Sequence, residues 1–277
     1  MANLSGPLKV GRVVLSGINL YRLNFGTYTG LGAKAVAWSL VPVYGWAKAA
    51  MIGGQIARLG VQTLVRQPES VPQVMERLQP KMWGFLGVGI LVGLIQLAVN
   101  LTLSVLVTVV MVPINLFGAL LGDVGTLIAV SIGGIVRIAL FLMQLWVQSR
   151  FLVFNVAIAV ETEKEATDAI GRSWSLSERS VFGVMGTLLL TGVMLMPIFL
   201  LTMIPFYFTL SPVADILTVP PEEISDAAIL TLLMAFAQGF LGFIVLVFVV
   251  QIFTNPLFQS VKAVLYAQLC DRQEDRT

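Results

Sequence analysis

Long runs of apolar residues without charge dominate this chain. Residues 82–122, 180–214 and 227–261 contain no Asp, Glu, Lys or Arg. An α-helix rises about 1.5 Å per residue, so roughly 20 apolar residues cross about 30 Å of hydrocarbon. Each run is long enough to do so. The pattern therefore predicts an all-α integral membrane protein.

Prolines and charged residues set the predicted ends of the helices. The clearest transmembrane helices are expected over four ranges: 83–112, 124–147, 181–209 and 227–254. Proline lacks a backbone donor and disfavours helix at the preceding residue, so Pro113 is expected to end the first helix and Pro256 to follow the last. Pro197 is expected to kink the third. Residues 257–277 would form a tail.

Residues 27–65 form a less clear apolar segment, which three basic side chains interrupt: Lys34, Lys48 and Arg58. Pro42 lies near its middle and predicts a turn between two helices. We read the segment as a helical hairpin whose first helix is short enough either to span or to re-enter. The chain would then be a single membrane domain, residues 1–277, built as a six-helix transmembrane bundle.

Two amphipathic segments are expected on the cytoplasmic side of the membrane. Residues 8–25 place Lys9, Arg12 and Arg22 on one side of a helix and apolar residues on another, which is typical of an interfacial helix. A short helix packed under the bundle is the alternative. Residues 161–178 predict a second interfacial helix. Its Trp174 suits the headgroup boundary, and Arg172 and Arg179 could hold lipid phosphates.

The loop charges predict an orientation. When residues 27–65 are counted as a hairpin, the loops on one side carry the basic residues. The opposite loops hold only acidic residues, which are Asp123, Asp215, Glu222, Glu223 and Asp226. Cytoplasmic loops are enriched in Lys and Arg, so both termini are expected in the cytoplasm. Counting residues 27–65 as one span would scatter the basic segments over both sides.

The composition removes most catalytic chemistry. The chain is 57% hydrophobic and 12% charged, and it has no His and one Cys, Cys270. Histidine is the usual general base and metal ligand, and one cysteine cannot form an intramolecular disulfide or a CxxC motif. No P-loop or nucleophile elbow is present. We expect no catalytic residue, metal site, cofactor or nucleic-acid partner; the expected partners are membrane lipids and other membrane proteins.

One charge lies deep within a predicted span. Arg137 is about 13 residues from Arg150, which corresponds to roughly 20 Å along a helix. A charge at that depth costs at least about 2.5 to 3.5 kcal/mol and should have partners. Gln96, Asn100 and Gln238 are expected at similar depth and could solvate the guanidinium. The four residues predict either a midplane site for an anionic ligand or interhelical hydrogen bonds.

The segment from Arg150 to Arg179 resembles part of a known family. It contains an apolar run ending at Glu161 and then the pattern A-I-x-R-S-W-x-L from Ala169 to Leu176. With the stretch before Phe25 and the final helix containing Tyr266, it resembles the membrane domain associated with bacterial glycerophosphodiester phosphodiesterases and its stand-alone relatives.

The resemblance implies a six-helix bundle in the bacterial cytoplasmic membrane or another internal bacterial membrane, such as a thylakoid. It does not imply phosphodiesterase activity, because the separate catalytic barrel of such enzymes, with its histidines, is missing from this sequence. The chain also has Gln268 where the family usually has an acidic residue.

Two functions remain open from the sequence. The first is a non-catalytic multi-pass membrane protein that organises lipids or partner proteins at the cytoplasmic leaflet. The alternative is a transporter or permease for a small or lipid-like anion, with Arg137 as the binding charge. Helices broken at Pro42 and Pro197 would suit transport, whereas the lack of an internal repeat argues against it.

Overall fold

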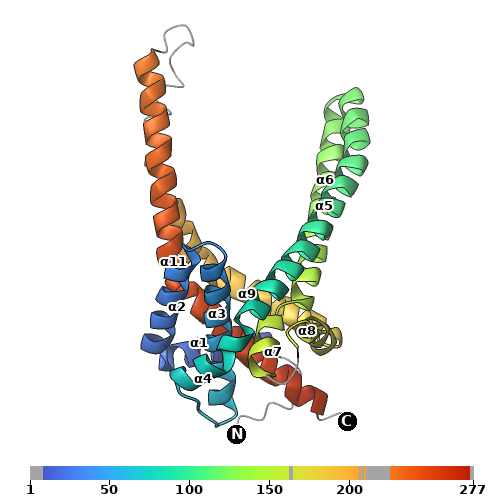
Figure 1. Ribbon diagram of the computed structural model, residues 1–277. Helices are drawn as coiled ribbons and strands as arrows, with labels where there is room; N and C mark the ends of the chain where they lie inside the picture. The colour runs from blue at the N-terminus through green and yellow to red at the C-terminus, as the bar shows by residue number, and fades with distance from the viewer. Residues whose placement is uncertain (1–8, 162–164, 206, 208, 210–224, 275–277) are drawn as a thin grey trace.

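The chain folds into helices that form a base and two diverging arms (Figure 1). The computed structural model describes residues 9–161, 165–205, 207, 209 and 225–274. One arm is the hairpin of α5 (Met82–Leu120) and α6 (Gly122–Arg150), and the other holds the first part of α11 (Asp226–Glu274) with α9 (Val181–Leu200) beside its lower part. The base contains the remaining helices: α1 (Val10–Leu23), α2 (Phe25–Ser39), α3 (Tyr44–Leu64), α4 (Val71–Leu78), α7 (Phe154–Val160) and α8 (Asp168–Glu178). Two short 3-10 turns, Gln79–Lys81 and Leu201–Met203, extend α4 and α9.

The arms have the character of membrane-embedded helices. Four helical segments in the described residues are long and apolar enough to cross a membrane, and α2 and α3 are not among them. Large apolar side chains on the arms are exposed, such as Val109, Leu127 and Leu233 at 65%, 68% and 63%. A water-soluble surface rarely carries so much contiguous apolar area. The all-α membrane class is confirmed.

Two predicted helix ends are wrong. The helix α5 continues through Pro113, and α11 continues through Pro256, so the described part of the predicted tail is helical. In apolar surroundings the peptide groups have no other partners, so a helix can persist around a single proline. At Pro256 the Ile252 carbonyl, which loses its usual donor, lies against Gly32 of α2. The missing Cβ of Gly32 allows this close approach.

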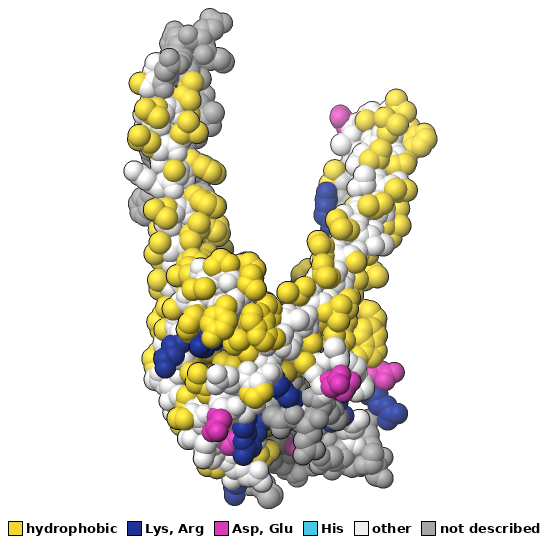
Figure 2. All heavy atoms as spheres, viewed as in Figure 1, with side chains coloured by type: hydrophobic (Ala, Val, Ile, Leu, Met, Phe, Trp, Pro, Cys, Tyr) yellow, Lys and Arg dark blue, Asp and Glu magenta, His cyan; other side chains and the backbone are white. Residues whose placement is uncertain are grey.

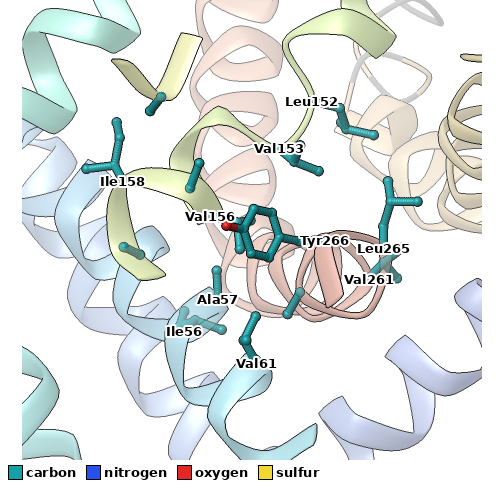
Figure 3. Packing of buried hydrophobic residues seen from close by; sticks show 14 of the residues in the cluster. Ile56, Ala57, Val61, Leu152, Val153, Val156, Ile158, Val261, Leu265 and Tyr266 are labelled. Carbon is teal, nitrogen blue, oxygen red and sulfur yellow. The ribbon is translucent and has the colours of Figure 1, made fainter. Parts of the chain in front are cut away.

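The core of the base lies where α3, α7 and α11 meet (Figure 3). Ile56, Val156 and Leu265 come from these three helices and are fully buried. The ring of Tyr266 extends from α11 toward Val156 of α7. The apolar run after Arg150 therefore forms a buried helix, α7, at the centre of the base.

The helix α1 lies within the base, with its apolar face covered by α11 and α9. Val13 and Val14 have 0% and 1% of their surface exposed. A Cβ added to Gly17 would lie only 2.7 Å from the Cα of Val261 on α11, so the two backbones are very close. The helix α1 therefore packs against the other helices with one face, and its position at the membrane interface stays a prediction.

The turn predicted near Pro42 is confirmed, because α2 ends at Ser39 and α3 begins at Tyr44. Apolar side chains at this turn are exposed, with Leu40 at 63% and Val43 at 54%. Several expectations fall on residues outside the described ranges: the acidic loop with Asp215, Glu222 and Glu223, part of the span 181–209, residues 162–164 of the interfacial helix and residues 275–277.

Candidate functional site

The structure does not bring the four predicted midplane residues together. Arg137 is exposed on α6 and makes no hydrogen bond or ion pair within the described ranges. Asn100 donates to the carbonyl of Gln96 on its own helix, at 2.9 Å. Gln238 lies on α11, in the other arm (Figure 1). A groove of about 460 Å³ between α5 and α6 includes Asn100 and Gln144 but not Arg137. The midplane ligand site stays a prediction.

Most of the predicted surface residues lie on the outside of the base, where charged side chains gather (Figure 2). Lys9, Arg12, Arg22 and Arg179 are exposed, and Trp174 is 41% exposed. Arg172 differs, because its Nε donates to Glu161 Oε1 at 2.7 Å and its Nη1 to Gln273 Oε1 at 2.6 Å. Its guanidinium links parts of the base to each other.

Glu161 is the centre of this link. Besides the Arg172 ion pair, its Oε1 accepts a hydrogen bond from the hydroxyl of Tyr266, at 2.7 Å. Lys81 Nζ donates to its backbone carbonyl, at 3.2 Å. The resemblance noted above includes Glu161, Arg172 and Tyr266, and the structure brings these three side chains into direct contact. Their role in this fold is to join α7, α8 and α11.

A second ionic network centres on Glu69. Arg58 binds its carboxylate with two nitrogens, Nε to Oε2 at 2.7 Å and Nη2 to Oε1 at 2.9 Å, and its third nitrogen, Nη1, donates to the Ala159 carbonyl. Arg77 Nη1 also donates to Glu69 Oε1, at 2.8 Å. The hydrogen bonds from Arg58, with the charges of Arg58 and Arg77, hold the pKa of Glu69 below its ordinary 4.5, although partial burial acts in the opposite direction.

A cleft of about 350 Å³ lies between α2, α3, α5, α7 and α11. Apolar side chains such as Val36 and Phe85 form part of its wall. Amide side chains continue the lining: Asn155 Nδ2 donates to Gln259 Oε1 at 2.8 Å, and Gln259 Nε2 donates to Asn255 Oδ1 at 3.2 Å.

One ammonium group also lines the cleft. Lys262 Nζ lies 4.6 Å from the ring centroid of Phe258 and makes no hydrogen bond or ion pair in the part of the chain that the structure describes. The carbonyl oxygen Oδ1 of Asn155 is buried and has no hydrogen-bond partner there. Buried polar groups normally find partners. The cleft can therefore offer a cation to an anion and an acceptor to a hydroxyl or amine.

Sequence reasoning missed this cleft, although a signal was present. Asn255, Gln259 and Lys262 follow one another at intervals of four and three residues, which places them on one face of a helix. The predicted span ended at residue 254 and the predicted tail began at residue 257, so Gln259 and Lys262 were assigned to the tail and Asn255 to neither. Asn155, the fourth polar residue, comes from α7 and could be joined to them only by the tertiary fold.

No known protein family matches the chain, and neither a curated protein nor a solved structure matches it. Two features carry the most information: the amphipathic cleft around Lys262, and the concentration of basic side chains on the base.

Proposed function

We propose that this chain is a non-catalytic multi-pass membrane protein that accommodates acidic membrane lipids in the cleft around Lys262. The observation that carries the proposal is the ammonium group of Lys262, without a polar partner in the described residues, in a cleft with apolar walls. An anionic headgroup would pair with Lys262, and a hydroxyl or amine on it could donate to Asn155 Oδ1. Acyl chains would lie against the apolar helices above.

The proposed topology has two transmembrane hairpins, α5–α6 and α9–α11, and a re-entrant hairpin, α2–α3. Together they make six helices, with the base on the cytoplasmic side. The exposed apolar tip of α2–α3, with Leu40 at 63% and Trp46 at 51%, supports its insertion into lipid. The basic residues around the base support the orientation by the positive-inside rule.

Lys262 fits the depth of a lipid headgroup in this topology. It follows Ile229, where the apolar segment of α11 begins, by 33 residues, which is about 50 Å of helix and more than the roughly 30 Å of hydrocarbon. An ammonium there would lie in the interfacial region, where an acidic headgroup is available and charge is tolerated.

The test is the lipid composition that the protein retains. Purification of the whole chain in native lipid discs, followed by mass spectrometry, should show enrichment of acidic lipids, and Lys262→Gln should lose most of it. Lys34→Gln is the matched control, since Lys34 is exposed on α2 and lies outside the cleft. Equal enrichment in the Lys262→Gln protein, at normal abundance, would overturn the proposal.

The alternative is a transporter for a small or lipid-like anion that uses Arg137. One observation favours it: this guanidinium is exposed on an arm and has no hydrogen bond or ion pair in the described ranges, so it is free to bind an anion. The alternative predicts anion uptake into vesicles that contain the protein, abolished by Arg137→Gln.

A further inference from the structure

A hollow of about 500 Å³ lies beside the start of α9 and shares no residue with the Lys262 cleft. Three guanidinium groups line it, those of Arg150, Arg179 and Arg272. Glu178 is the one carboxylate among its lining residues in the described chain. A neighbouring hollow of about 340 Å³ shares Glu178, Arg179 and Arg272. The surface around α9's first turn therefore has an excess of positive charge.

Arg150 is the deepest of the three arginines. It is 9% exposed, and its Cζ lies 5.0 Å from the ring centroid of Trp146 and 4.9 Å from that of Trp174. Nε and Nη1 are buried and have no hydrogen-bond partner in the structure described. The two rings attract the cation but satisfy none of these donors. Buried donors without acceptors are costly, so the site favours a ligand that supplies acceptors.

The first turn of α9 adds donors of its own. The regular bonds of this 20-residue helix begin when the amide of Val184 donates to the carbonyl of Ser180, at 3.0 Å. The amides of residues 181–183 precede that bond and have no partner within the helix. The Ser180 hydroxyl does not cap them and instead accepts from Arg272 Nη1, at 2.8 Å. No acidic residue lies in this turn, which suits an anion at the helix N-terminus.

We propose that this hollow is a binding site for a phosphate group. A phosphate accepts hydrogen bonds from several directions, and guanidinium groups such as those of Arg150, Arg179 and Arg272 donate in planar forks that suit phosphate oxygens. Among the described lining residues, only the carboxylate of Glu178 would repel the negative charge of the phosphate. The phosphate can belong to a lipid headgroup or to a small soluble molecule. Phe182, which lines the hollow and is 85% exposed, supports the lipid source.

Tryptophan fluorescence can detect occupancy, because Trp146 and Trp174 flank Arg150. The full chain in detergent micelles is titrated with inorganic phosphate, with dihexanoyl phosphatidic acid and with hexanoate. We expect a saturable response to a phosphate-bearing ligand and none to the carboxylate. Arg150→Gln and Arg179→Gln should each weaken binding at least about tenfold, since each removes charge-assisted hydrogen bonds.

Arg12→Gln is the matched control, because Arg12 is exposed on α1 and lies outside the hollow. Saturation by inorganic phosphate indicates a soluble ligand, and saturation by the phosphatidic acid alone indicates a headgroup. If Arg150→Gln does not fold, Arg179→Gln carries the test, since its side chain is exposed. No saturable response, or equal weakening by Arg12→Gln, would overturn the proposal. Lys262→Gln should leave the response unchanged, which separates this site from the cleft.

Discussion

Replacing Glu69 by Gln should destabilise the protein more than removing its partner Arg58. In Glu69→Gln the amide oxygen can still accept one hydrogen bond, but Arg58, 3% exposed, would lose the negative charge that pairs with its guanidinium. In Arg58→Met the Glu69 side chain, 14% exposed, would keep its ion pair with Arg77 and some access to water. Comparing the unfolding free energies of the two variants therefore tests whether Arg58 needs the charge of Glu69 more than Glu69 needs the charge of Arg58.

The magnitudes follow from burial. Removing one partner of a buried ion pair costs about 3 to 5 kcal/mol because the other charge stays uncompensated. We expect Glu69→Gln to lose about 3 kcal/mol of unfolding free energy. Arg58→Met should lose about 1 to 2 kcal/mol, since water and Arg77 compensate the carboxylate. Glu76→Gln is the control, since Glu76 is exposed on α4 and lies outside the network, and it should stay within about 0.5 kcal/mol of the unmodified protein.

The assay is unfolding in mixed micelles of increasing SDS content, at two pH values. Because the folded-state pKa of Glu69 is below 4.5, its contribution to stability is present above pH 4.5 and is lost as the pH falls through the folded-state pKa. The gap between the unmodified protein and Glu69→Gln should therefore narrow in acid. Equal losses in Glu69→Gln and Arg58→Met, or a gap that does not change with pH, would refute the reasoning.

Two further predictions concern the packing around Gly32 and the exposed charge of Arg137. Gly32→Ala would bring a Cβ against the Ile252 carbonyl and to 2.6 Å from the Pro256 ring, so the same assay should show a loss of about 1 to 3 kcal/mol. Gly30→Ala, on the same helix with open space around it, should gain up to about 1 kcal/mol, and an equal loss at both positions would contradict the packing. Arg137→Leu should maintain or increase the folded protein in membranes, because an exposed charge no longer enters the bilayer; a decrease would show that Arg137 has partners.

The local pattern of the sequence was enough to predict the fold class of the protein and most of its helices. In the described residues the charge-free runs overlap α5, α9 and α11, and the turn at Pro42 lies between α2 and α3 as predicted. Apolar runs and turn residues act over a few neighbours, so they can be read without a fold. The helix α4 also has a local signal, the capping box of Ser70 and Gln73, although no helix was predicted there.

The helix ends at Pro113 and Pro256 could not be read in the same way. A proline removes one backbone bond, and whether the helix stops depends on what else can satisfy the neighbouring peptide groups. At Pro256 the Ile252 carbonyl lies against Gly32, more than 200 positions away in the sequence. This contact depends on the tertiary fold, so the local sequence could not show it.

By itself the sequence determined that this is an all-α membrane protein with apolar helices, because hydrophobicity is a property of each segment. Only the tertiary structure decided which polar groups have partners. Arg58 meets the Ala159 carbonyl across 101 positions and Asn155 meets Gln259 across 104, whereas Arg137 lies apart from Gln238. Electrostatic and hydrogen-bond partners must be within a few ångströms of each other, and that proximity is created by helix packing rather than by the order of residues along the chain.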